Sequence, residues 1–210
     1  MSRWAAREAM QDRILDTAGR LFYGQGIRAV GVDTIAAEIG ISKRTLYNYF
    51  PSKDQLIVAY LSRHALPPKT SERPLLEQIM RIFDWLERWF ASEAFRGCPF
   101  VNAIAELGDA THPGTKMAVA YKEQRRVWLR DALRRLDVAD PDGLSTQISI
   151  LVEGAIIAAL VRGDPTMAAA AKAAARVLLT AAGVPDPDAA APVLKVAQRR
   201  RKRTRRAAPP

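Results

Sequence analysis

The sequence predicts an all-α protein with about nine helices. Apolar residues recur at spacings of three and four through most of the 210-residue chain, which is the periodicity of one helical face. No segment shows the sustained alternation of apolar and polar residues that a half-buried strand requires. Glycine and proline separate the apolar stretches, so we expect helices joined by short turns.

Four helices are expected in the first third of the chain. The first should end near Gly24 and the second at Gly40, because glycine adopts turn conformations that other residues resist. Ser42 is a good N-cap for the third helix, and Pro51 lies just before the fourth. The apolar positions place these helices at residues 7–24, 32–39, 43–49 and 53–64.

The next helices follow a break in the chain. Adjacent prolines cannot continue a helix, so Pro67 and Pro68 mark the clearest internal boundary. A second break is expected at residues 140–143, where the sequence reads DPDG. The same spacing predicts five more helices, at residues 74–90, 100–107, 113–136, 144–162 and 166–182.

The charge of the chain is concentrated at its C-terminal end. The net charge is +10, but eight of the 32 cations lie between Lys195 and Arg206, with no acid among them. Residues 1–194 therefore carry 24 cations against 22 acids. The basic end has no apolar pattern, so we expect it to be disordered. It either follows phosphates beside a DNA site or is a solvated extension without function.

The sparse cysteines and histidines exclude several classes of protein. Cys98 is the single cysteine, and His64 and His112 are the two histidines. A disulfide framework is excluded, and we expect no metal site and no cofactor. The N-terminal segment lacks the apolar stretch of a secretory signal, and no run approaches the roughly 18 apolar residues of a membrane span. We therefore expect a cytoplasmic protein with no membrane partner.

The stretch from residue 32 to residue 53 carries the chemistry. Ala36 and Gly40 supply the small residue and the turn glycine that two closely crossing helices need. Leu46 would pack the second of these helices onto the first. The opposite face would then present groups that can read base edges in a DNA major groove, namely Lys43, Arg44, Tyr47 and Asn48. The alternative is a solvated charged face with Tyr47 half-buried.

The complete order of residues in this stretch is specific. Its elements are Ile35-Ala36, Gly40, Thr45-Leu46-Tyr47, Tyr49-Phe50 and Ser52-Lys53. This order resembles the DNA-binding domain of the TetR family of bacterial repressors. The resemblance implies a helix-turn-helix DNA-binding domain at 1–54, a helical ligand-binding and dimerisation domain at 55–184, and a disordered basic tail at 185–210.

The resemblance also implies roles for individual residues. The segment from Ser42 to Thr45 opens the recognition helix toward DNA. Tyr47, Tyr49 and Lys53 contact backbone phosphates. The chain departs from the family at Gly31, where members often have a Thr or Ser cap, and it has Asp33 in the first turn, where a carboxylate suits the helix dipole but repels phosphate. The DNA-binding set is thus Ser42, Lys43, Arg44, Thr45, Tyr47, Asn48, Tyr49 and Lys53.

A small-molecule pocket among the middle helices is likewise implied by the resemblance. Aromatic residues would form its apolar walls, and a few polar residues would orient the ligand. The candidates are Phe83, Trp85, Trp89, Phe100, Asn102, Glu106, His112, Tyr121 and Trp128. The competing interpretation is that these aromatic residues are ordinary core.

The helix expected at 144–162 is apolar nearly all round and needs cover on more than one side. The helix at 166–182 has the same character. A C2 dimer that buries both as a four-helix interface would supply this cover, whereas the alternative is central burial in a monomer. The residues expected at the interface are Leu151, Gly154, Ala155, Ala158, Ala159, Ala174, Val177 and Leu178.

The resemblance, together with these patterns, implies a homodimeric transcriptional regulator, most simply a repressor that binds a pseudo-palindromic DNA operator and leaves it when a small effector binds. It would be associated with the bacterial nucleoid when bound to DNA. Two alternatives differ in class. One is a nonspecific architectural DNA-binding protein driven by the basic tail. The other is a cytosolic helical enzyme that uses Cys98 as nucleophile and His112 or His64 as base.

Overall fold

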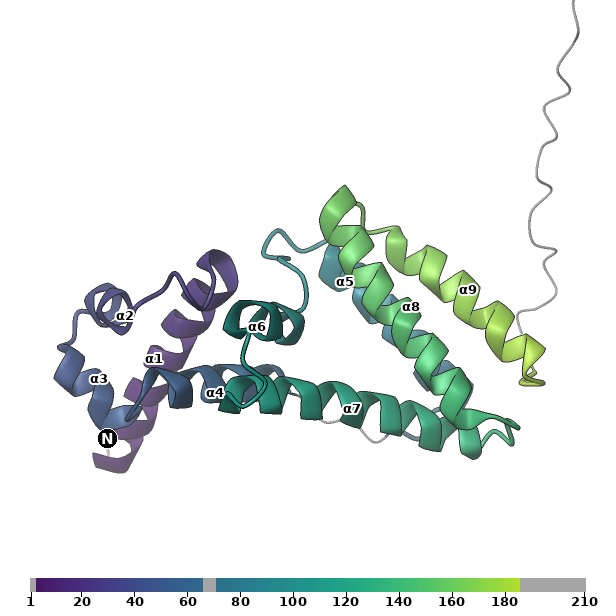
Figure 1. The fold of residues 1–210 in the computed structure, drawn as a ribbon, viewed down its shortest axis with the longest axis horizontal. Helices are drawn as coiled ribbons and strands as arrows, with labels where there is room; N and C mark the ends of the chain where they lie inside the picture. Colours follow the sequence, from purple (N-terminus) through teal and green to yellow (C-terminus); the bar gives the residue numbers. More distant parts are fainter. Residues whose placement is uncertain (1–2, 66–70, 186–210) are drawn as a thin grey trace, which may run out of the picture.

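The computed structural model describes residues 3–65 and 71–185, and this part of the chain contains nine helices and no strand (Figure 1). The all-α prediction is therefore confirmed. The predicted boundary at Pro67 and Pro68 and the predicted tail after Pro185 lie outside the described residues. The helices are α1 (Arg3–Gln25), α2 (Val32–Ile39), α3 (Lys43–Tyr49), α4 (Lys53–His64), α5 (Leu75–Phe90), α6 (Pro99–Leu107), α7 (Pro113–Arg134), α8 (Pro141–Arg162) and α9 (Met167–Ala181).

Two helices begin earlier than predicted. Helix α1 starts at Arg3 rather than at residue 7, because the segment Arg-Trp-Ala-Ala before residue 7 contains good helix formers although it lacks apolar periodicity. Helix α8 starts at Pro141, inside the expected break. Asp140 caps it by accepting the N–H of Gly143 at 2.9 Å, and proline is tolerated in a first turn because no N–H donor is needed there.

The nine helices form two groups, one toward each end of the molecule (Figure 1). Helices α2 and α3 lie at one end of the molecule beside α1, and α8 and α9 run side by side near the other end (Figure 1). Helix α4 connects the groups, because it contacts α1 on one side and α7 and α6 on the other. The N-terminal helices are therefore packed directly on the helices that follow residue 71.

One hydrophobic core extends through both groups. It reaches from Ile14 in α1, through Leu46 in α3 and Leu56 in α4, to Leu179 in α9. Densely packed interiors transmit displacements instead of absorbing them. A change among the C-terminal helices can thus reach the N-terminal ones.

Helix α8 has an unusual distribution of apolar residues. It is the single described helix that is long and apolar enough to cross a membrane by length and composition, which is weak support for a span. Its inner face, including Leu144, Ile148 and Ile156, is buried in the protein, and the helix packs on α7 and α9. A core helix of a helical bundle meets the same criteria.

Candidate nucleic-acid interface

Helices α2 and α3 form a helix-turn-helix around Gly40. This glycine ends α2 with φ of +76°, and its N–H donates to the carbonyl of Ala37 at 3.1 Å. The N–H of Ile41 donates to the carbonyl of Ala36 at 3.0 Å. No atom crowds a Cβ placed at Gly40, so the left-handed backbone conformation is what favours glycine here.

The position of α3 is fixed by a cap and by one buried residue. The Ser42 hydroxyl accepts the N–H of Thr45 at 3.0 Å, and the two hydroxyl oxygens lie 2.8 Å apart. Leu46 is completely buried in the core. Because this short helix is capped at its N-terminus and anchored at its centre by Leu46, its rotation about its own axis is determined.

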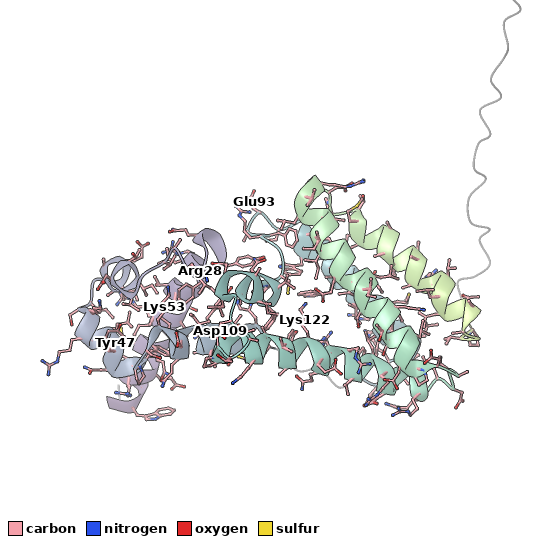
Figure 2. All side chains as sticks on the ribbon, in the orientation of Figure 1. Arg28, Tyr47, Lys53, Glu93, Asp109 and Lys122 are labelled. Carbon is pink, nitrogen blue, oxygen red and sulfur yellow. The ribbon has the colours of Figure 1, made fainter. Side chains whose placement is uncertain are left out.

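The face of α3 opposite Leu46 is exposed and polar. Lys43, Arg44, Tyr47 and Asn48 all lie on it, as the sequence pattern predicts. The Arg44 side chain makes no hydrogen bond or ion pair with any residue that the structure describes. The Lys43 ammonium lies 2.9 Å from a carboxylate oxygen of Asp33 on α2, and this hydrogen bond raises the pKa of Lys43. Tyr47 lies at the α3 end of the molecule (Figure 2).

A cation from α1 joins this face and was not found from the sequence. The guanidinium of Arg7 lies 5.0 Å from the centre of the Tyr49 ring and donates to the Asn48 carbonyl at 3.2 Å. Tyr49 itself is half-buried. The contacts join residues more than 40 positions apart, and the only sequence signal was an unassigned arginine in an expected helix.

Lys53 lies at the first position of α4, where Ser52 caps the helix by accepting the N–H of Gln55 at 3.1 Å. Its side chain is half-buried. Burial lowers the pKa of Lys53, and the carboxylates of Asp54 and Glu106 partly offset that effect. Lys53 therefore sits near the junction between the two helix groups as well as near the helix-turn-helix.

Polar contacts join α1 and the loop after it to the α6 region. The Tyr23 hydroxyl donates to the Gly97 carbonyl and accepts the N–H of Arg96, each at 2.8 Å. Burial raises the pKa of Tyr23. The Glu106 carboxylate accepts the N–H of Arg28 at 3.0 Å, and Arg28 lies beside α6 (Figure 2). These contacts attach α1 and the loop after it to the helices that follow residue 71.

His112 and Glu106 were expected to orient a ligand, but the structure places both at this junction. His112 is the N-cap of α7, and its Nδ1 accepts the N–H of Gly114 at 3.0 Å. Its Nε2 lies 3.2 Å from a carboxylate oxygen of Asp54 on α4. Glu106 faces the loop between α1 and α2. Sequence periodicity could not predict the contact of Glu106 with this loop, because its partner Arg28 lies 78 residues away along the chain.

The other pocket candidates lie at several separate places. Phe83 is core, whereas Trp85 is 52% exposed and stacks on the half-buried Trp89 at 4.9 Å between ring centres. Trp128 is half-buried beside Arg125, and the Asn102 amide donates to the Arg96 carbonyl. The structure therefore does not gather all the predicted residues around one cavity.

One pair of candidates does come together, beside a polar cluster. Phe100 and Tyr121 stack with ring centres 4.0 Å apart. The Lys122 ammonium lies 2.7 Å from the Glu153 carboxylate. Burial lowers the pKa of Lys122, but the Cys98 and Glu153 groups outweigh it, so the pKa is raised. The described residues contain no group of three or more His, Cys, Asp and Glu that could hold a metal ion.

The outer face of α8 contains some residues of the predicted dimer interface, namely Gly154 and Ala158, but not others. Ala155 and Ala159, two of the predicted residues, are 5% and 2% exposed and face the interior of the protein. The remaining predicted residues are exposed or half-buried, and Val177 on α9 is 61% exposed. Larger apolar residues line a groove along the outer face of α8 together with Gly154, namely Ile150, Ile157 and Val161.

Comparison with known proteins extends over most of the chain. The family model described as "Bacterial regulatory proteins, tetR family" matches residues 14–60, and the model "Tetracyclin repressor-like, C-terminal domain" matches residues 76–175. An uncharacterized HTH-type transcriptional regulator of Bacillus subtilis, YxaF, is 25% identical over 172 residues, which is 77% of this chain and 90% of that protein.

A second regulator and a solved structure are also similar to this chain. The HTH-type transcriptional activator FasR of Mycolicibacterium smegmatis is 34% identical over 92 residues, which cover 39% of this chain and 42% of FasR. The crystal structure of a TetR-type transcriptional regulator from Streptomyces avermitilis superposes with a TM-score of 0.74 and 30% sequence identity. That match covers 83% of this chain and 98% of the other.

Proposed function

The chain belongs to the TetR family of bacterial transcriptional regulators and binds DNA through a helix-turn-helix, and from this premise we propose that it is an effector-responsive repressor that binds a pseudo-palindromic operator as a homodimer. The observation that carries the proposal is the exposed face of α3. Lys43, Arg44 and Asn48 project from it, and Leu46 holds the helix from behind.

Each side chain on this face suits a particular part of DNA. The Arg44 guanidinium, free of partners among the described residues, can donate two hydrogen bonds to guanine O6 and N7 in the major groove. The Asn48 amide can pair with adenine N6 and N7. Tyr47 and Tyr49 of α3 and Lys53 at the start of α4 are assigned to phosphates, which position the protein without reading sequence.

A second copy of the chain is proposed to cover α8. A dimer that reads two successive major grooves needs recognition helices about 34–36 Å apart, so the two copies must be joined away from α3. The apolar groove along α8, with Ile150, Ile157 and Val161, lies on the C-terminal group of helices. Two-fold packing of this face would remove exposed apolar area from water.

The effector is proposed to bind near the Phe100 and Tyr121 pair. Stacked rings beside the Lys122 and Glu153 ion pair combine apolar walls with a few polar groups, as small-molecule sites commonly do. Cys98, which raises the pKa of Lys122, follows Gly97, whose carbonyl accepts the Tyr23 hydroxyl. An effector that prefers a displaced α6 would thus disturb the contacts that hold the DNA-facing helices.

A second candidate is transcriptional activation, because the FasR activator is similar to this chain over 92 residues. The two candidates differ in where the operator lies relative to the promoter. For either, we place the protein in the cytoplasm, where regulators of this family act, and on the nucleoid when it is bound to DNA.

Enrichment of bound duplexes from a random DNA pool tests the proposal. We expect an inverted repeat whose half-sites lie about one helical turn apart, or a multiple of it. Full-length protein without a preferred sequence would refute operator binding. Screening small molecules for release of the enriched duplex then tests the effector.

A further inference from the structure

A salt bridge joins the two helices of the helix-turn-helix on its exposed side. Asp33 lies in the first turn of α2, and Lys43 is the first residue of α3. The Lys43 ammonium lies 2.9 Å from a carboxylate oxygen of Asp33, and both side chains are at least half exposed. Exposed pairs of this kind contribute little to folding stability. The pair itself therefore adds little to folding, beyond the favourable interaction of the Asp33 carboxylate with the dipole of α2.

The position of Asp33 is unfavourable for DNA binding in general. The N-cap of α2 is Gly31, which offers no side chain to the first-turn N–H groups of the helix. Such uncapped N–H groups attract phosphates, but a carboxylate beside them repels phosphates. Asp33 is tolerable near DNA as long as the Lys43 ammonium neutralises it.

The Lys43 ammonium can serve Asp33 and DNA at the same time. A lysine ammonium has three N–H donors, so one can stay on Asp33 while others reach guanine O6 and N7. This arrangement is available where a guanine lies opposite Lys43. On other sequences Lys43 would gain by turning to a phosphate, but it would then leave Asp33 unpaired in the field of the DNA backbone.

We propose that Asp33 is a specificity-determining residue that holds Lys43 toward base edges and penalises its transfer to the phosphate backbone. This inference rests on the DNA-binding function proposed above. Asp33 acts through Lys43 and has no partner of its own on the DNA. Asp33 raises the ratio of specific to nonspecific binding because it weakens binding to nonspecific DNA. Many selective interfaces exclude competitors in this way.

The chain offers a matched control on the same helix. Glu38 on α2 pairs with Arg20 on α1 at 2.6 Å, and the Glu38 side chain is 49% exposed, compared with 72% for Asp33. Glu38→Gln removes one negative charge per subunit, as Asp33→Asn does. The control therefore reproduces the general electrostatic gain without freeing Lys43.

The experiment measures binding of the full-length protein to the enriched duplex and to a shuffled duplex of the same composition. Wild type, Asp33→Asn, Glu38→Gln, Lys43→Ala and the double variant Asp33→Asn/Lys43→Ala are compared at several salt concentrations. Circular dichroism and melting curves verify that each variant is folded.

Asp33→Asn should tighten binding to the shuffled duplex about three- to tenfold more than Glu38→Gln does, because the released Lys43 neutralises a phosphate in each subunit. The slope of log K against log salt on that duplex should steepen by about two per dimer. Binding to the enriched duplex should change by no more than about twofold relative to the control, so discrimination falls. In the Lys43→Ala background, the Asp33 effect should shrink to that of Glu38→Gln.

Two results would overturn the inference, and they are distinguishable. If wild type discriminates between the duplexes and Asp33→Asn keeps the same ratio as Glu38→Gln, Asp33 acts only as a general negative charge. If wild type itself does not distinguish the duplexes, the proposed operator binding fails and this inference fails with it.

Discussion

Helices α3 and α8 both expose side chains that the packing of their own chain does not use, but the two exposed faces differ in chemistry. Helix α3 presents Lys43, Arg44 and Asn48, whereas α8 presents Ile150 and Ile157. Cations and amides are suited to a polyanion with hydrogen-bonding edges, and a row of aliphatic residues is suited to another apolar surface. The α3 face therefore suits DNA, and the α8 face suits the second copy of the chain proposed above.

The largest expected effect comes from placing a charge on the α8 face. Ile157 is 48% exposed and lines the groove, so Ile157→Arg would bury an unpaired charge in a dimer seam and should shift the protein to monomer. Loss of the second half-site should weaken operator binding about 10²- to 10⁴-fold. Sedimentation and binding to the enriched duplex measure the two effects.

Val119→Arg is the control for that prediction. Val119 lies on α7, is 53% exposed, and is not part of the α8 groove. The Val119→Arg substitution should leave the protein dimeric. If Ile157→Arg also remains dimeric, the interface lies elsewhere. A charge at Ala155 would not test the interface, because that residue is buried in the core of its own chain.

The next effect concerns the α3 face. Arg44→Ala should weaken binding to the enriched duplex by about 1–3 kcal/mol, and it should relax base preference at particular positions. Lys53→Ala should weaken binding to all DNA sequences by similar factors, because a phosphate contact carries no sequence information. Titrations on the enriched and shuffled duplexes separate these outcomes. Equal losses on both duplexes for Arg44→Ala would remove it from direct readout.

The basic tail allows a third prediction, which asks whether α3 is the only cationic surface that DNA meets. Lys195 to Arg206 contain eight cations, and each neutralised phosphate adds about 0.9 to the salt slope of log K. Removing residues 186–210 should therefore flatten that slope by several units per dimer and weaken nonspecific binding most. Preference for the operator should persist. An unchanged slope would leave the tail without a role in DNA binding.

The two faces were not equally predictable from the sequence. The outward direction of α3 follows from local features, namely the turn at Gly40, the cap at Ser42 and one buried position at Leu46. Helix α8 is apolar nearly all round, so its periodicity could not separate the inner face with Ala155 from the outer face with Ile157. Small residues were therefore assigned to the interface, although two of the alanines lie inside.

Contacts between distant parts of the chain were also beyond the sequence patterns. The spacing of residues within a helix predicts which of them share a face, but not which other helix lies opposite. Arg7 beside Tyr49 and Glu106 beside the Arg28 backbone are contacts of this kind. Most helix positions were predictable, since caps, glycines and apolar spacing are local.

The smallest expected effect is the most discriminating for α8, because two physical terms oppose each other at Gly154. This residue lies inside α8, and no atom of the described chain comes within 4 Å of a Cβ placed there. Within one subunit, Gly154→Ala should therefore stabilise the helix by about 1 kcal/mol. If two α8 helices approach closely at this position, the added methyl group meets the partner and weakens the dimer.

We expect a dimer that dissociates more readily although its subunits are no less stable. Sedimentation equilibrium and melting curves at several protein concentrations measure the two properties. Dimer affinity equal to that of wild type, together with a higher melting temperature, would mean that Gly154 lies outside the seam and that the larger residues Ile150, Ile157 and Val161 keep the two helices apart.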